Sequence, residues 1–370
     1  GTKTVATVDG TDIPLGVVSL YAREQQQQTT TMYLNYMGSA DNIWDQTAGD
    51  DSDETYGDQA VTSSLESIEK MYVLKEKAAD YKVELTDDDE AAIADAASQF
   101  MAANSEETIK ELAVTEDQVK TLLELQTIQK KMYDPVVEEG NITVSDDEAN
   151  QTTFTYVSIS TSGDDVTDEE KETKKEQAQE ILDKMKEDPA ADMSEIAKGV
   201  DDSYSAVQGN FTTKESEDED EDSSSEAYPD EVLKVLRGLK DGEVADNIIE
   251  TDTGYYVVRL DKINDEDATA SKRESLQNSK ESTYFTDTTA KWLDEADVKV
   301  VKKVLKTLKI TDKHTFMAPT PTPIPETPTP EVTEEATPTP ETEEVTETPA
   351  AEETVEATET PEATPTEAAK

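Results

Sequence analysis

The sequence contains no cysteine and only one histidine in 370 residues. The absence of cysteine excludes a disulfide framework, a thiolate nucleophile and a zinc ribbon. A single histidine excludes chemistry that needs a histidine pair. No run approaches the roughly 20 consecutive apolar residues that cross a bilayer. We therefore expect no cofactor, no metal centre and no membrane-spanning helix.

Positive charge is also scarce, because 33 lysines and arginines stand against 87 aspartates and glutamates, a net charge of −54. A chain this acidic repels phosphate backbones, which excludes nucleic acid as a partner. Hydrophobic residues make up 34% of the chain, less than in an ordinary soluble domain. That shortage is unevenly distributed.

Much of the shortage lies in residues 318–370, which consist mainly of Thr, Pro, Glu and Ala. This stretch holds 11 of the 15 prolines, 14 glutamates against one lysine, and no aromatic residue. Such a composition cannot bury enough apolar surface to offset the entropy of ordering. We expect a disordered tail over residues 311–370, with the single histidine, His314, as a linker residue at its beginning.

A second biased run, residues 214–226, reads KESEDEDEDSSSE. Mutual repulsion of its carboxylates favours a solvated acidic loop. Carboxylate oxygens also suit calcium, but the run lacks the spaced glycine and the final glutamate of an EF-hand loop. The solvated loop is the main interpretation and a calcium site is the alternative.

The N-terminal part combines a hairpin signal with helical patterns. Asp9-Gly10 between Thr4–Val8 and Thr11–Ile13 predicts a β-hairpin, and Pro14 suits the first turn of a helix that follows. Apolar spacing and capping threonines predict three further helices. These helices cover residues 61–81, 87–103 and 115–137.

In the middle of the chain the spacing of apolar residues changes, and alternating stretches appear beside helical ones. Alternation predicts strands over 154–159, 247–250 and 254–260, and apolar spacing predicts helices over 168–187, 193–198 and 232–239. The resulting order, β-α-α-α-β-β, indicates a small α+β domain over residues 152–263. A mainly helical segment follows over residues 264–310.

Three motifs resemble those of PrsA-type and SurA-type extracytoplasmic foldases. Val5–Ile13, VATVDGTDI, is similar to their opening "V-A-x-V-N/D-G-x-x-I", and Asp192–Ala197 is similar to "D-F-x-x-L/I-A". Leu239–Val244 with Ile248–Leu260 is similar to "L-x-x-G-E-V-S-x-P-V-x-T-x-x-G-Y-H-I-I-K-L".

The resemblance implies an α+β architecture in four parts. Residues 1–151 would form a helical chaperone domain, completed by residues 264–310. A parvulin-like peptidyl-prolyl isomerase domain with the acidic loop would be inserted as residues 152–263. The disordered tail over 311–370 would follow.

The resemblance also places the family's site on this sequence. The two catalytic histidines of parvulins fall at Tyr156 and Tyr256, and their aspartate or cysteine falls at Asp201, or at Asp202 if the loop shifts by one. The peptide-binding pocket corresponds to four further side chains: Phe211, Tyr228, Val232 and Leu236.

Tyrosine at both histidine positions leaves two hypotheses. A tyrosine hydroxyl both donates and accepts hydrogen bonds, so a Tyr156–Asp–Tyr256 network would support an active isomerase. Alternatively the tyrosines fill the space of the imidazoles, and the domain is kept for peptide binding. The main prediction is a foldase that binds unfolded secreted proteins. The alternatives are an active isomerase and a non-catalytic surface-display protein, although no internal repeat or LPxTG-like signal supports the latter.

Large apolar residues also occur in a polar region after the first helix: Met32, Tyr33, Tyr36, Met37, Trp44 and Tyr56. Such residues either present an adaptable surface to clients or lock a loop onto the body. The sequence leaves both interpretations open.

Partners and location follow mainly from the resemblance. A lysine stripe over Lys299–Lys309 is either a solvated face or a docking surface for an anionic wall polymer, and a homodimer is a further alternative. Gly1-Thr-Lys3 looks like a mature start after a processed segment. We expect an extracytoplasmic lipoprotein at the outer face of a Gram-positive cell membrane, in contact with lipid only through an anchor outside this sequence.

Overall fold

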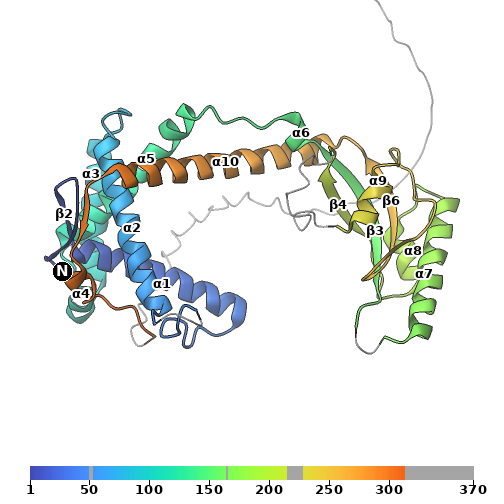
Figure 1. Ribbon diagram of the computed structural model, residues 1–370, viewed down its shortest axis with the longest axis horizontal. Helices are drawn as coiled ribbons and strands as arrows, with labels where there is room; N and C mark the ends of the chain where they lie inside the picture. The colour runs from blue at the N-terminus through green and yellow to red at the C-terminus, as the bar shows by residue number, and fades with distance from the viewer. Residues whose placement is uncertain (50–52, 164–165, 215–227, 313–370) are drawn as a thin grey trace, which may run out of the picture. The chain divides into compact units, whose positions relative to one another are not determined.

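The computed structural model describes four segments of the chain: residues 1–49, 53–163, 166–214 and 228–312 (Figure 1). Nearly all of the predicted acidic loop, and the predicted tail from residue 313 onward, lie outside the described residues, and so does His314. The predicted α+β class is confirmed, with a three-stranded and a four-stranded antiparallel sheet.

The predicted N-terminal hairpin is present as β1 (Thr4–Val8) and β2 (Thr11–Pro14). Its turn residues Asp9 and Gly10 have φ angles of 47° and 86°, the left-handed region that Asp-Gly turns adopt. A third strand, β7 (Val298–Val300), pairs antiparallel with β1 and makes the sheet order β2-β1-β7. The sequence pattern did not reveal β7, because a three-residue strand carries no periodicity of its own.

The helices associated with this sheet come from both ends of the described chain. They are α1 (Leu15–Met37), α2 (Tyr56–Lys77), α3 (Asp87–Ala103), α4 (Glu106–Leu112), α5 (Glu116–Glu139), α10 (Glu266–Glu295) and α11 (Lys302–Leu305). The side chains of Thr86 and Thr115 accept hydrogen bonds from backbone N–H groups of α3 and α5 and form capping boxes there. These local signals explain why both helices begin where the sequence predicts. Helix α4 was not predicted, since seven residues are too few to show a periodic apolar stripe.

One apolar core joins the hairpin to α1, α2 and α5. Its fully buried members include Ile13, Leu20, Ile68, Leu122 and Leu125. A second cluster lies between α2, α5 and α10, where the Phe285 ring lies 5.1 Å from that of Tyr133 and the Trp292 ring 5.7 Å from that of Tyr81. The segment that follows the middle part of the chain thus packs against the N-terminal helices.

The second sheet has the strand order β4-β3-β6-β5. Its strands are β3 (Gln151–Ser160), β4 (Val207–Thr212), β5 (Ile249–Thr251) and β6 (Gly254–Lys262). The helices of this part are α6 (Asp146–Ala149), α7 (Asp168–Glu187), α8 (Met193–Val200) and α9 (Asp230–Leu236). Helix α7 begins and ends at the predicted residues.

Strand β4 corrects the predicted element order. The order from β3 to β6 is β-α-α-β-α-β-β, whereas the sequence predicted β-α-α-α-β-β. Val207–Thr212 contains a glycine and two amides, so its own strand propensity is low. Its pairing with β3 along six residues forms the strand, and this non-local contact leaves no signal in the local sequence.

The faces of this sheet carry different clusters because strand side chains alternate. Val157 and Ile159 of β3 and Val257 of β6 pack with α7 and α8 in one apolar cluster. Phe154 of β3 and Val258 of β6 belong to a separate cluster with α9. The residues that the sequence predicts as a site fall mainly in the cluster with α9.

Candidate functional site

The two tyrosines at the predicted histidine positions lie on adjacent strands of one sheet. Tyr156 of β3 stands opposite Val258, and Ser158 stands opposite Tyr256 of β6. Tyr156 and Tyr256 are therefore diagonal neighbours, with ring centroids 5.9 Å apart. The structure brings these two predicted residues together.

Tyr228, directly before α9, packs against the same face. Its ring lies edge-on to Tyr156 at 5.7 Å and to Phe154 at 4.9 Å. Gly209 of β4 makes room for it, since a Cβ there would lie 2.2 Å from the Tyr228 hydroxyl oxygen. A larger residue at position 209 would displace Tyr228, so the glycine that weakens β4 as a strand also shapes this site.

Phe154 is a residue that the sequence reasoning left out of the site. It is fully buried, stacks on Tyr156 at 5.3 Å and meets Phe211 at 5.8 Å. Its position two residues before Tyr156 on one strand was the available signal, because such residues share a face. We call these five rings the aromatic cluster: Phe154, Tyr156, Phe211, Tyr228 and Tyr256.

The predicted pocket residues Val232 and Leu236 lie on α9 and are fully buried in the apolar cluster beside these rings. In this structure they pack in the same apolar cluster as the five rings. The surface available to a peptide is that of the half-buried tyrosines.

Burial and the neighbouring phenols Tyr228 and Tyr256 raise the pKa of Tyr156. The phenol of Tyr156 is therefore neutral at physiological pH, as an ordinary tyrosine is, and its hydroxyl can donate a hydrogen bond to a carbonyl oxygen. The aromatic cluster thus combines an apolar surface with hydrogen-bonding hydroxyls, which suits a peptide backbone.

The two predicted aspartates have a different environment. The Asp201 carboxylate accepts hydrogen bonds from the Ser203 hydroxyl at 2.6 Å and the Ser203 backbone N–H at 2.9 Å, and these bonds lower the pKa of Asp201. Asp202 is exposed. Among the described residues, no hydrogen bond links either aspartate to Tyr156 or Tyr256. The hypothetical Tyr156–Asp–Tyr256 network is therefore not formed here.

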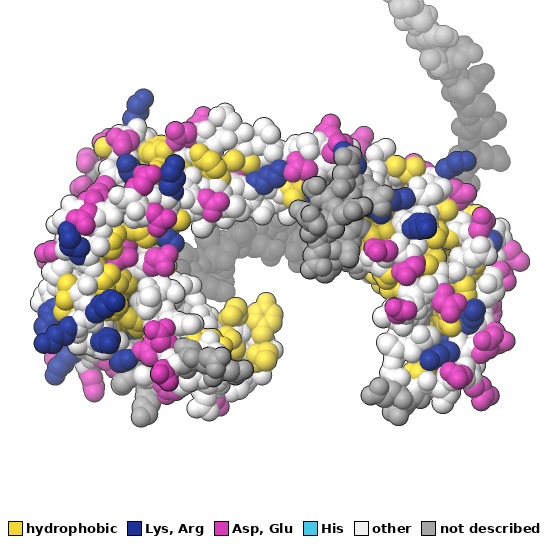
Figure 2. Space-filling view, viewed as in Figure 1, with side chains coloured by type: hydrophobic (Ala, Val, Ile, Leu, Met, Phe, Trp, Pro, Cys, Tyr) yellow, Lys and Arg dark blue, Asp and Glu magenta, His cyan; other side chains and the backbone are white. Residues whose placement is uncertain are grey.

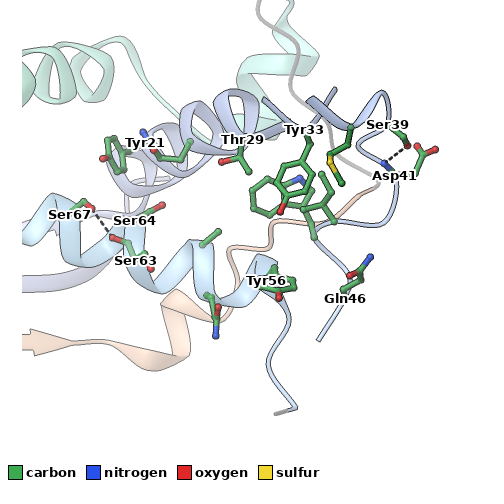
Figure 3. Close-up of a pocket in the computed structure, with 16 residues that line it drawn as sticks. Tyr21, Thr29, Tyr33, Ser39, Asp41, Gln46, Tyr56, Ser63, Ser64 and Ser67 are labelled. Atoms are coloured by element: carbon green, nitrogen blue, oxygen red, sulfur yellow. Dashed lines mark hydrogen bonds between the residues drawn. The ribbon is translucent and has the colours of Figure 1, made fainter. Parts of the chain in front are cut away.

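A second candidate site lies between α1 and α2. A cavity of about 640 Å³ is lined by both helices and by the loop that joins them. In Figure 3, Tyr33 of α1 and Tyr56 at the beginning of α2 flank this cavity. Met37 and Trp44 also line it, and among the described residues Asp41 is its single charged lining residue. We call it the α1–α2 groove.

The last two turns of α1 are exposed on every side. The exposed fraction is 83% for Tyr36, 75% for Met37 and 50% for Met32. Figure 2 shows these hydrophobic side chains gathered over the free end of the helix. Contiguous apolar side chains in contact with water typically mark an interaction surface.

Trp44 behaves differently from the other apolar residues of this region. Only 5% of it is exposed, and its indole N–H donates a hydrogen bond to the Thr30 hydroxyl at 3.3 Å. Trp44 therefore locks the loop onto α1, whereas Met32, Tyr36 and Met37 face solvent. Trp44 thus matches the interpretation of a loop locked onto the body, and Met32, Tyr36 and Met37 match that of an exposed adaptable surface.

Within the described segments, no group of three or more His, Cys, Asp or Glu side chains is arranged to hold a metal ion. Across the same residues, no helix is long and apolar enough to cross a membrane.

Residues 148–275 match the family model of the PPIC-type PPIase domain. This part of the chain is a PPIC-type PPIase domain. The predicted parvulin-type identity is thereby confirmed, and the match extends beyond the predicted 152–263 at both ends, into α6 and the beginning of α10. The whole aromatic cluster lies within the PPIase domain.

Several solved structures are similar to the chain. One is the foldase protein PrsA from Lactococcus lactis, with 17% identity, 83% of this chain and 97% of that chain covered, and a TM-score of 0.34. Another is the peptidylprolyl isomerase PrsA from Bacillus cereus, with 18% identity, coverages of 68% and 88%, and a TM-score of 0.31. A SurA-like chaperone from Campylobacter jejuni has 11% identity, coverages of 80% and 99%, and a TM-score of 0.28. No curated protein matches the chain.

Proposed function

We propose that the protein is an extracytoplasmic foldase of the PrsA/SurA type that holds unfolded polypeptides in the α1–α2 groove. Its PPIase domain binds peptides on the aromatic cluster and isomerises prolyl bonds slowly or not at all. The exposed apolar end of α1 beside the groove is the observation that carries this proposal.

The groove has the properties that a client-binding surface needs. Methionine and tyrosine supply apolar area that adapts to many sequences, and Met37, Tyr33 and Tyr56 all line the cavity. Among the described residues Asp41 is its single charged lining residue, and the serine, threonine and glutamine side chains of the lining can form hydrogen bonds with a client backbone. The net charge of −54 keeps a protein with such a surface soluble.

The PPIase domain supports binding better than catalysis. The uncatalysed barrier to rotation of a prolyl bond is about 20 kcal/mol, and an isomerase must stabilise the twisted amide. The resemblance places histidines where this chain has Tyr156 and Tyr256, and Asp201 is engaged with Ser203. The rings that remain offer a peptide stacking area and hydroxyl donors without the histidine pair.

Client binding is tested by suppression of the aggregation of a denatured protein. A Tyr33→Ser/Met37→Ser variant should bind clients about tenfold more weakly, because central aromatic and aliphatic contacts dominate such interfaces. A Val300→Ser/Val301→Ser variant is the matched control, since both valines are exposed and lie away from the groove. Equal loss in both variants, or suppression unchanged by the first, would refute groove binding.

Catalysis is tested with a proline-containing tetrapeptide. The wild-type rate should stay within a few-fold of the uncatalysed rate, and a Tyr156→His/Tyr256→His variant should exceed it, because it restores the imidazole pair on adjacent strands. A clear wild-type acceleration that Tyr256→Phe abolishes would instead establish an active isomerase.

The proposal also includes a location at the cell membrane and two further partners, an anionic wall polymer and a second copy of the chain. The resemblance to lipid-anchored relatives supports attachment to the outer face of a Gram-positive cell membrane. Lys299, Lys302, Lys303, Lys306 and Lys309 are all exposed, spread over β7, α11 and the turn that follows. Lys299 is paired with Asp297 and Lys309 with Asp58, which leaves the middle of the stripe as the part suited to an anionic wall polymer. A homodimer stays a prediction, tested by the molecular mass in solution.

A further inference from the structure

The last described residues run as a strap across the middle of α1 and the beginning of α2. We define the strap as Leu308–Asp312. Leu308 and Ile310 are buried in the core of the N-terminal helices. The Arg23 guanidinium of α1 donates a hydrogen bond to the Lys309 carbonyl at 2.9 Å, and the Gln26 side-chain amide donates one to the Thr311 carbonyl at 3.2 Å. The strap is therefore fixed to α1.

The strap also approaches the beginning of α2 closely. A Cβ on Gly57 would lie 1.9 Å from the Ile310 carbonyl oxygen, so only glycine allows this contact. The Lys309 ammonium forms an ion pair with Asp58 at 2.7 Å. Both helices that line the α1–α2 groove thus contact the strap.

Asp312 brings the end of the strap to the groove itself. Its carboxylate accepts hydrogen bonds from the backbone N–H of Trp44 at 3.1 Å and of Asp45 at 2.9 Å. Trp44 lines the groove. The chain therefore leaves the described structure directly beside the groove, at a position fixed by two hydrogen bonds.

The sequence that follows Asp312 contains a suitable occupant. Phe316 and Met317 come four and five residues later and are the largest apolar side chains after the strap. Four extended residues reach roughly 13 to 14 Å. The stretch from Thr315 to Pro325 has no charged residue, and the first glutamate is Glu326. This uncharged stretch matches the sparsely charged lining of the groove.

We propose that Phe316 and Met317 occupy the α1–α2 groove of their own chain and compete with clients for it. This inference rests on the proposed function, because competition requires that clients bind in the same groove. A short link from Asp312 gives the two side chains an effective concentration in the millimolar range. Contacts from only two side chains are weak, so the segment lowers client affinity a few-fold and strong clients displace it.

Contact between tail and groove is tested by disulfide cross-linking in the full chain. Because the sequence has no cysteine, Met37→Cys with Met317→Cys supplies the only possible disulfide within one chain. The matched control is Tyr36→Cys with Met317→Cys, since Tyr36 is the neighbouring residue, more exposed and outside the groove lining. The Met37 pair should cross-link several-fold faster, at a rate independent of protein concentration.

Equal rates for the two pairs would overturn the proposal. A cross-link between chains that depends on concentration would overturn it in favour of a second copy as the occupant.

Competition is tested by the affinity for a fluorescent unfolded peptide. A Phe316→Ser/Met317→Ser full-length variant should bind the peptide roughly two- to fivefold more tightly, as expected when a tethered competitor is removed. Val345→Ser/Val355→Ser, farther along the tail, is the control and should leave the affinity unchanged. Unchanged affinity in the Phe316→Ser/Met317→Ser variant would refute the competition.

The Tyr33→Ser/Met37→Ser variant separates the two proposals. If it leaves peptide affinity unchanged, clients bind elsewhere and the proposed function of the groove fails. If it weakens peptide binding while the Phe316→Ser/Met317→Ser variant has wild-type affinity, only the tail inference fails.

Discussion

Glu69 of α2 should make the stability of the protein depend strongly on pH. Only 6% of this residue is exposed, and its Oε1 atom has no hydrogen-bond partner among the described residues. Burial, and to a smaller extent repulsion by Glu66, raises the pKa of Glu69 from 4.5 to about 7. At neutral pH the folded protein therefore holds a carboxyl group whose ionisation is unfavourable.

The direction and the size of the effect follow from this pKa. Between pH 4.5 and 7 the folded state binds more protons at Glu69 than the unfolded state, so the free energy of unfolding falls as pH rises. At about 1.36 kcal/mol per pKa unit, the difference between 4.5 and about 7 corresponds to roughly 3 kcal/mol above pH 8. Glutamine has no such penalty because it stays neutral.

Urea unfolding of the wild type and Glu69→Gln at several pH values measures this directly. The series should begin at pH 5, above the sequence pI of about 4.1 where solubility is lowest. Glu69→Gln should be more stable than the wild type by an amount that grows by about 2 to 3 kcal/mol between pH 5 and pH 8.5. Comparing variants cancels the titration of the other carboxylates.

Glu66→Gln is the matched control on the same helix. It removes the repulsive charge, together with the exposed ion pair of Glu66 with Lys70, so it should lower the pKa of Glu69 slightly and produce a smaller pH-dependent change in the same direction. If the stability difference between Glu69→Gln and the wild type is the same at every pH, Glu69 is ionised normally and the reasoning from its burial is refuted.

Three further substitutions test the packing and the caps. Gly209→Ala should destabilise the PPIase domain by about 1 to 3 kcal/mol through overpacking against Tyr228, and an unchanged midpoint of thermal unfolding would contradict that contact. Thr86→Ala should cost about 1 kcal/mol in urea unfolding because it removes the capping box of α3, and no loss would show that the cap is dispensable. Asp312→Ala should cost about 1 kcal/mol because it removes the hydrogen bonds to the backbone N–H groups of Trp44 and of the exposed Asp45, and in a Trp292→Phe background acrylamide should then quench Trp44 fluorescence more strongly. Unaltered quenching would mean that the strap does not fix the loop.

Prediction from the sequence succeeded where the signal is local. The Asp9-Gly10 turn and the threonine caps at Thr86 and Thr115 can be predicted from neighbouring residues alone, because each motif involves residues at most three positions apart. Strands β4 and β7 were missed because each forms by pairing with a strand distant in the sequence. The residues of β4 have low strand propensity, and β7 has too few residues to show an alternating pattern.

For the candidate sites, the resemblance pointed to residues that lie on β3 and β6, and the structure decided how their side chains are arranged. Tyr156 and Tyr256 share a sheet face, as expected for the family's two histidines, and Tyr228 and Phe211 join them. Asp201 does not join these rings, because the turn after α8 directs its carboxylate to Ser203. The direction of the Asp201 side chain depends on the backbone conformation of this turn, which the resemblance to the family's sequence motifs does not specify.

The sequence by itself determined the scarcity of cysteine and histidine, the acidic charge, the composition of residues 318–370 and most of the helices. These are properties of composition or of neighbours along the chain. Only the tertiary structure decided that α1 ends in exposed apolar turns beside a groove, and that a strap from the far end of the described chain reaches this groove through Asp312. Burial and hydrogen bonding between residues more than 260 positions apart depend on the whole fold, and no local pattern encodes them.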